Sequence, residues 1–187
     1  MIETPSDYFA DLWAGSHDPW DHAGRWYETR KYDLTVAALP APQYHHAVEP
    51  ACGIGLLTTR LAARADRVTA SDRFPRAVAE ATARCSAQPH VTVEVADVRD
   101  GPPDAPFDLA VLGEVLYYFD AGTAVDVLRR WHRGVTAGGH LVLVHHRPAV
   151  AEHVLDGDDV HAIADDLLGA PLVHVVDELF RIDVFTR

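Results

Sequence analysis

The sequence has 187 residues, of which 48% are hydrophobic and 24% charged. These values are typical of a globular protein that can bury a core in one domain. The net charge is −12 with neutral histidines, and even the densest basic stretch, 129–133, fits the end of an exposed helix. We therefore expect no nucleic-acid partner, because an acidic surface repels phosphates.

Features of export and membrane insertion are missing from the sequence. No apolar run approaches the length of a membrane span, and the N-terminus lacks a basic region followed by an apolar one. The two cysteines, Cys52 and Cys85, form neither a disulfide framework nor a four-ligand zinc site. We expect a cytoplasmic protein without membrane contact.

The N-terminal stretch predicts two short helices. The first is expected to follow Ser6 as its N-cap and to bury Phe9, Leu12 and Trp13. A turn at Asp18-Pro19-Trp20 then separates it from the second helix.

The second helix is predicted from Trp26 to Leu39. Tyr27, Leu34 and Ala38 recur on one face of this helix, and Pro40 ends it. These N-terminal helices (residues 1–40) are expected to form a lid on the rest of the chain.

From His46 onward, short apolar runs alternate with helical windows, which predicts a parallel sheet covered by helices. The last two strands are separated by only three residues and must form an antiparallel hairpin. The strands are predicted at Ala47–Glu49, Arg67–Ser71, Val91–Val95, Leu109–Leu112, Leu141–Val144, Leu172–Val176 and Phe180–Phe185, and the helices at Leu56–Ala65, Arg76–Cys85 and Ala121–Trp131.

This pattern predicts an α/β fold with a Rossmann-like sheet of seven strands, five parallel and two in the terminal hairpin. We expect one domain over residues 1–187, with a helical cap at 1–40 and a Rossmann-like core at 41–187. A dinucleotide dehydrogenase normally continues into another parallel strand and a substrate domain, for which no residues are left.

The first predicted strand ends in an acid that is followed by a glycine-containing loop and a helix. Gly53 and Gly55 allow close approach of the backbone to a ligand, and the helix N-terminus offers unpaired N–H groups. A glycine loop alone also fits a tight turn with no cofactor. The sequence of this strand end, loop and helix start is Val48-Glu49-Pro50-Ala51-Cys52-Gly53-Ile54-Gly55-Leu56-Leu57-Thr58.

Acids also end the next two predicted strands. Asp72 lies 17 residues after Gly55, where a carboxylate can bind both hydroxyls of a ribose. NAD is still possible at this point, but Thr58 occupies the third glycine position of the dinucleotide fingerprint, which favours a ligand without a pyrophosphate. Asp97 can accept from an adenine amino group while Val98 packs on the ring. Three acids at one sheet edge mark the usual ligand site of open α/β sheets.

These motifs resemble class I S-adenosylmethionine-dependent methyltransferases over essentially the whole chain. The sequence is most similar to the nodulation protein S group, which N-methylates the amino-sugar end of a chitooligosaccharide. The resemblance rests on the glycine loop and on Asp18-Pro19-Trp20, Trp26-Tyr27-Glu28, Arg30-Lys31-Tyr32, Phe107-Asp108-Leu109 and Glu114-Val115-Leu116-Tyr117-Tyr118. The family usually has glycine where this chain has Ala51, which is tolerable if its φ is negative.

The resemblance implies S-adenosyl-L-methionine as cofactor, S-adenosyl-L-homocysteine as product and a small molecule as methyl acceptor. Arg30 or Lys31 is expected to bind the cofactor's carboxylate. Trp20 and Tyr27 either cap the cofactor or anchor the N-terminal helices, and Trp26 is expected to anchor. The implied cofactor contacts are Trp20, Tyr27, Arg30, Lys31, Glu49, Ala51, Gly53, Gly55, Asp72, Arg73, Asp97, Val98 and Glu114.

Methyl transfer is an in-line displacement that positioning and desolvation can accelerate without a covalent catalyst. An amine acceptor must only be neutral, whereas a hydroxyl acceptor needs a base. The candidate catalytic residues after the fourth and fifth strands are Glu114, Tyr117, His145 and His146, and core packing is an alternative role for the two histidines and Tyr117.

Three functions stay open at this point. An amino group on a sugar-like acceptor is the first expectation. The alternatives are an O-methyltransferase of a secondary metabolite that uses His145 or His146 as base, and a non-catalytic protein that binds S-adenosylmethionine. The histidine spacings match no compact metal motif, so we expect no metal site. Cys52 is expected to be a small packed side chain.

Overall fold

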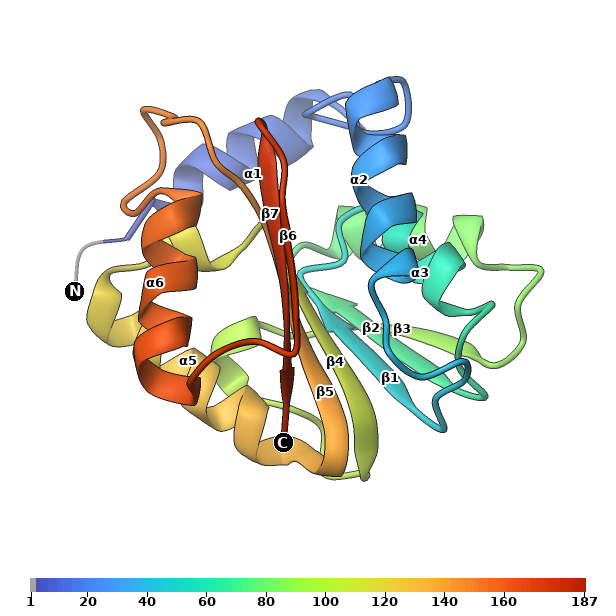
Figure 1. Ribbon diagram of the computed structural model, residues 1–187. Helices are drawn as coiled ribbons and strands as arrows, with labels where there is room; N and C mark the ends of the chain where they lie inside the picture. Colours follow the sequence, from blue (N-terminus) through green and yellow to red (C-terminus); the bar gives the residue numbers. More distant parts are fainter. Residues whose placement is uncertain (1–2) are drawn as a thin grey trace. The chain divides into compact units, whose positions relative to one another are not determined.

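The computed structural model describes residues 3–187. It has seven strands in the order β3-β2-β1-β4-β5-β7-β6 (Figure 1). Strand pairs β1–β2, β2–β3 and β4–β5 are parallel, while β7 pairs antiparallel with both β5 and β6. The predicted fold, parallel strands followed by an antiparallel C-terminal pair, is confirmed. The strands are β1 Ala47–Pro50, β2 Val68–Asp72, β3 Val91–Val95, β4 Phe107–Gly113, β5 Val135–His146, β6 Val173–Val176 and β7 Phe180–Thr186.

The chain divides into two compact units. One is Pro5–Asp100, with strands β1 to β3. The other comprises Glu3, Thr4 and Gly101–Arg187, and contains strands β4 to β7.

The unit Pro5–Asp100 places two helices against β2. These helices, α3 (Leu56–Leu61) and α4 (Pro75–Arg84), contact β2 and each other. Gly55 precedes α3 with φ +78°, and a Cβ added to it would lie 3.0 Å from the Cα of Ala81 in α4. Only glycine combines this left-handed conformation with such a close approach. The loop before α3 is therefore shaped by the packing of α3 on α4.

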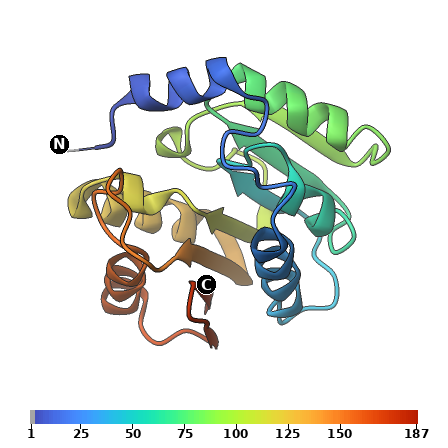
Figure 2. The same ribbon diagram turned by 90° about the horizontal axis from the view of Figure 1, so that it is seen from above.

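The first N-terminal helix, α1 (Ser6–Gly15), lies next to α4 (Figure 2). Phe9 and Trp13 are buried as predicted, whereas Leu12 is only partly buried. The Arg76 guanidinium donates to the Trp13 carbonyl oxygen at 2.7 Å. The prediction that Ser6 is the N-cap is wrong. Pro5 precedes the helix, and the Ser6 hydroxyl accepts a hydrogen bond from Arg73 at 2.5 Å, because that guanidinium offers a stronger donor than a backbone N–H.

The second helix, α2 (Trp26–Ala37), buries a different face from the predicted one. Its buried residues are Glu28, Lys31, Tyr32 and Thr35, at helical spacing i, i+3, i+4 and i+7. A polar stripe can be buried here because the Lys31 ammonium pairs with the Glu28 carboxylate at 2.8 Å. The apolar pattern of the sequence therefore indicated the wrong side of α2.

In the unit with β4 to β7, α5 (Ala121–Gly134) and α6 (Gly157–Leu168) lie side by side (Figure 1) and both contact β5. Helix α6 was not predicted. Its N-terminus carries a capping box, in which Asp156 and Asp159 each accept from the other's backbone N–H. A Cβ added to Gly157 would collide with the backbone oxygen of His146, so the absence of a side chain allows α6 to meet the end of β5.

Candidate functional site

Glu49 lies at the end of β1 with a side chain that is almost completely buried, since the residue is 4% exposed. Its Oε2 accepts a hydrogen bond from the Thr58 hydroxyl at 2.6 Å. Burial raises the pKa of Glu49 to about 8, against the lowering effect of the Thr58 hydrogen bond and with a further rise from the charge of Asp72. The ligand-free protein therefore holds this carboxyl in its neutral form near neutral pH.

The loop after Glu49 contains three residues with left-handed backbone conformations. Their φ values are +55° at Ala51, +54° at Gly53 and +78° at Gly55. The condition for tolerating alanine, a negative φ, is thus not met at Ala51, which adopts the left-handed conformation that glycine takes up without strain. A Cβ added to Gly53 would meet nothing within 4 Å, so a ligand has room beside this backbone.

Replacing Ala51 by glycine is expected to stabilise the ligand-free protein by about 0.5–1 kcal/mol, because a left-handed alanine costs about 1 kcal/mol more than glycine there. Chemical denaturation of both proteins measures this difference. Ala79→Gly in the exposed face of α4 is the matched control and should lose about 1 kcal/mol. Equal losses at both positions would contradict a strained Ala51.

Asp72 ends β2 and joins the glycine loop to the start of α4. Its Oδ2 accepts from the Gly53 N–H and its Oδ1 from the Phe74 N–H, each at 3.0 Å. Burial raises the pKa of Asp72, while these two backbone hydrogen bonds oppose the rise. The backbone therefore holds both oxygens in place, and each keeps a lone pair for a ligand hydroxyl.

Asp97, after β3, is engaged by a residue that the sequence analysis did not consider. Its two oxygens accept from Arg99, from the Nε at 3.0 Å and a terminal guanidinium nitrogen at 2.7 Å. Burial alone would raise the pKa of Asp97, but the hydrogen bonds and charge of Arg99 outweigh it and hold the pKa below its ordinary value. Arg73 lies 3.9 Å away as a second cation, and Val98 is buried beside them.

The two cations proposed from α2 differ in their surroundings. Lys31 is 1% exposed, forms its ion pair with Glu28 and lies 4.8 Å from the ring centroid of Tyr27. The Arg30 side chain is more exposed. The charge of Lys31 is thus already balanced by a buried carboxylate.

The N-terminal aromatic residues have separate positions. The Trp20 ring packs edge-on against Trp13 with centroids 5.8 Å apart and stacks on His22 at 5.5 Å. The expectation that Trp26 anchors the helix is wrong, since Trp26 is 74% exposed at the start of α2. The buried face of α2 begins two residues later, which leaves Trp26 on the outer side.

In the other unit, the Glu114 carboxylate accepts hydrogen bonds from two other candidate catalytic residues, Tyr117 and His146. Glu114 follows β4 with φ +53° and accepts from the Tyr117 hydroxyl at 2.5 Å. The same Glu114 oxygen accepts from the backbone N–H of His146, at the end of β5, at 2.9 Å. These contacts bring the Glu114 carboxylate, the Tyr117 hydroxyl and the His146 backbone together.

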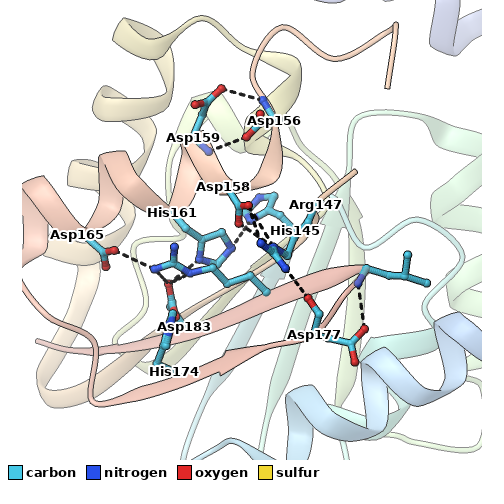
Figure 3. Close-up of polar contacts among 12 residues, drawn as sticks. His145, Arg147, Asp156, Asp158, Asp159, His161, Asp165, His174, Asp177 and Asp183 are labelled. Atoms are coloured by element: carbon cyan, nitrogen blue, oxygen red, sulfur yellow. Dashed lines mark hydrogen bonds and ion pairs between the residues drawn. The ribbon is translucent and has the colours of Figure 1, made fainter. Parts of the chain in front are cut away.

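His145 belongs to a buried polar chain that only the structure reveals (Figure 3). Its Nδ1 lies 3.2 Å from the Nε2 of His161 in α6, whose Nδ1 lies 2.7 Å from an Asp183 oxygen in β7. All three residues are 0% exposed. Arg181 also donates to Asp183 at 2.8 Å. His145 therefore ties β5 to α6, while its ring edge faces Tyr117 with centroids 5.3 Å apart.

The two cysteines are buried, and the described residues hold no cluster of metal ligands. Cys52 and Cys85 are free and buried, and Cys52 packs with Ala70 and Ala81. Burial raises the pKa of the Cys52 thiol well above its ordinary value, so it stays protonated. Within residues 3–187 no group of three or more histidine, cysteine or acidic side chains is arranged to hold a metal ion.

Three residues that contact the proposed site residues were not predicted from the sequence. They are Arg99, Glu28 and His153. Arg99 follows Asp97 by two positions, and Glu28 precedes Lys31 by three, the spacing of a helical ion pair. Those short separations could have been read from the sequence. His153 stacks on Tyr117, but its distance along the chain gives no local signal for that contact.

Comparisons with known proteins agree with this geometry. A family model described as a methyltransferase domain matches residues 47–139. A nodulation protein S from Rhizobium tropici is 30% identical over 81% of this chain and 66% of its own length. One from Sinorhizobium fredii is 33% identical over 59% of this chain and 51% of its own length. This chain thus spans between about half and two thirds of those relatives.

Solved structures extend the similarity to the whole sheet. A putative methyltransferase from Pseudomonas syringae has a TM-score of 0.77 and 34% identity, over 87% of this chain and all of that one. This chain belongs to the methyltransferase family, in the class with the seven-stranded sheet. Within that class it is similar to the N-methyltransferase NodS from Bradyrhizobium japonicum WM9, solved with S-adenosyl-L-homocysteine, at a TM-score of 0.83 and 25% identity over 97% of both chains.

Within residues 3–187, no helix has the length and hydropathy needed to span a bilayer.

Proposed function

We propose that this protein transfers a methyl group from S-adenosyl-L-methionine to a small-molecule acceptor, with an amino group on a sugar-like molecule as the first candidate. The observation that carries the proposal is the set of acids at the ends of β1, β2 and β3, namely Glu49, Asp72 and Asp97, around a glycine loop with open space at Gly53. The similarity to a NodS structure that contains S-adenosyl-L-homocysteine supports the same cofactor.

Each acid has a distinct place in the proposed cofactor site. Asp72, with both oxygens held by backbone N–H groups, would bind the ribose hydroxyls. Asp97 with Val98 would hold the adenine, and Arg73 would support Asp97. Glu49, with Ala51, Gly53 and Gly55, would lie along the methionine part. When bound, the cofactor supplies a sulfonium methyl group whose transfer needs a correctly placed acceptor.

For the cofactor's carboxylate we propose Arg30 rather than Lys31. The Lys31 ammonium is buried and paired with Glu28, so moving it to a ligand would leave a buried carboxylate uncompensated. A guanidinium also matches a carboxylate with two parallel hydrogen bonds. We propose that Trp20 and Tyr27 belong to the lid around the methionine part, which keeps water away from the sulfonium.

On the acceptor side we propose Glu114, Tyr117, His145 and His146. Glu114 supplies a negative charge and Tyr117 an aromatic ring, a combination that attracts an ammonium group. His145 packs against the Tyr117 ring in a T-shaped arrangement, and His146 donates its backbone N–H to Glu114. The charge and rings favour an amine over a hydroxyl acceptor.

Calorimetric titration with S-adenosyl-L-homocysteine tests the cofactor site. The Asp72→Ala variant is expected to bind more weakly by roughly 1–3 kcal/mol, since it loses a carboxylate that accepts from the ribose. Asp104→Ala, at an exposed position, is the control and should bind like the wild type. Unchanged affinity in Asp72→Ala would remove Asp72 from the site, and comparable affinity for NAD would favour a dehydrogenase.

The same titration with Arg30→Ala tests the carboxylate ligand. Product analysis after incubation with S-adenosyl-L-methionine and glucosamine then separates the functions. A methylamine supports the proposal, a methyl ether supports O-methylation, and reversible cofactor binding without product over a panel of amines and alcohols supports a binding protein.

A further inference from the structure

A histidine outside the four proposed acceptor-side residues lies against the same aromatic ring. His153, in the loop between β5 and α6, stacks on Tyr117 with ring centroids 3.7 Å apart and an interplanar angle of 14°. The edge of Tyr118 meets the same imidazole at 5.0 Å. The imidazole thus contacts two tyrosine rings that also contact each other, and one of these tyrosines donates its hydroxyl to Glu114.

The loop that carries His153 is fixed by hydrogen bonds to the short helix η2 (Leu116–Tyr118). The backbone N–H groups of Val154 and Leu155 both donate to the Tyr117 carbonyl oxygen, at 2.9 and 3.0 Å. On the other side of His153, the Thr4 hydroxyl donates to the Glu152 carbonyl oxygen at 2.5 Å. The position of the imidazole over Tyr117 is therefore set by backbone contacts on both sides.

The exposure of His153 distinguishes it from His145. The latter is 0% exposed and engaged with His161, so an acceptor or a water molecule has no access to it in this structure. His153 keeps intermediate exposure, although its Nδ1 is buried and makes no hydrogen bond within residues 3–187. Because part of the ring is exposed, the imidazole can take up a proton and pass it to solvent.

Several charged groups act on the His153 imidazole. Burial lowers its pKa and the neighbouring His146 lowers it further, while the carboxylates of Glu114 and Glu152 raise it, with a net lowering. The rings packed on it are those of Tyr117 and Tyr118. The imidazole is therefore neutral at neutral pH, which is the form that accepts a proton.

We propose that His153 is the proton acceptor for the methyl acceptor's amino group, a role that rests on the proposed function. An alkylammonium group beside Glu114 and Tyr117 gives one proton to a ring nitrogen of His153 and becomes a neutral amine. The amine's lone pair then bonds to the sulfonium methyl carbon, while the carbon–sulfur bond breaks and its electrons stay on sulfur. One methylated ammonium, one S-adenosyl-L-homocysteine and one proton result, and the proton leaves His153 for water.

Two substitutions of His153 separate proton transfer from packing. His153→Phe keeps an aromatic ring on Tyr117 but cannot accept a proton, and His153→Ala leaves space for added imidazole. With glucosamine as acceptor, both variants should lose about hundredfold in kcat with little change in KM. The increase of kcat with pH that reflects a neutral imidazole should disappear in both. Imidazole in the buffer should restore the Ala variant and not the Phe variant.

The control is His17→Ala, an exposed histidine in the other unit, which should keep the wild-type kcat with and without imidazole. S-adenosyl-L-homocysteine affinity and melting temperature, measured for all variants, report on folding. Wild-type kcat and pH profile in His153→Phe would overturn the assignment, as would a loss in His153→Ala that imidazole does not restore. A wild type that binds S-adenosyl-L-homocysteine but methylates no amine would overturn the proposed function, and this assignment with it.

Discussion

Replacing Glu49 by glutamine is expected to stabilise the ligand-free protein at alkaline pH and to leave its stability near about pH 4.5 almost unchanged. The Glu49 side chain is buried and its pKa is raised from 4.5 to about 8. Between these values the folded protein holds a proton that the unfolded chain releases, so the free energy of unfolding of the wild type falls as the pH rises. Glutamine resembles the protonated acid, can still accept from Thr58, and cannot ionise.

The size of this effect follows from the pKa difference. At about 1.4 kcal/mol per pKa unit, the stabilisation of the variant at about pH 9 is at most about 5 kcal/mol. Urea unfolding at a series of pH values measures it. The control is Glu94→Gln on the exposed side of β3, which should follow the wild-type pH dependence. Parallel pH dependence in the Glu49 variant and the wild type would contradict a neutral buried carboxyl.

Replacing Asp183 by alanine is expected to destabilise the protein by about 3–5 kcal/mol, because it removes a fully buried acceptor and leaves the buried His161 and the partly buried Arg181 and His174 without this hydrogen-bond partner. Asp183 is fully buried and accepts from Arg181 at 2.8 Å, while its oxygens also lie 2.7 Å from His161 and 2.5 Å from His174 (Figure 3). Arg181 contacts Asp165 of α6 as well, so the loss should extend to the packing of α6 on β7.

Thermal and urea unfolding measure this loss, with Asp166→Ala on the exposed face of α6 as the matched control. Burial alone would raise the pKa of Asp183, but hydrogen bonds from His161, His174 and Arg181 hold it below its ordinary value. Its stabilising contribution is therefore present above about pH 4 and is lost as the pH falls further. A loss below about 1 kcal/mol in Asp183→Ala would contradict a structural role for the network.

Much of the fold could be predicted because its signals are local. Alternating apolar strands and helical windows indicated the parallel sheet, and a separation of three residues at Asp177-Glu178-Leu179 required a hairpin. Helix α6 also had a local signal, the capping box of Asp156 and Asp159, but its acids and histidine obscured the apolar positions. The boundaries of α3 and β5 differ from the predicted ones because helix and strand ends depend on packing partners.

The sequence by itself determined the sheet and the acids at its edge, since parallel strands bring Glu49, Asp72 and Asp97 to the same side wherever they pair. It did not determine the buried face of α2. Glu28 and Lys31 can be buried only because they pair with each other, so the buried face of this helix is polar where an apolar face is usual. Only the tertiary structure decided the contacts of the histidines. His145 contacts His161, and His153 contacts Tyr117. The residues of each pair lie far apart in the sequence on different elements, so no local sequence pattern indicates these contacts.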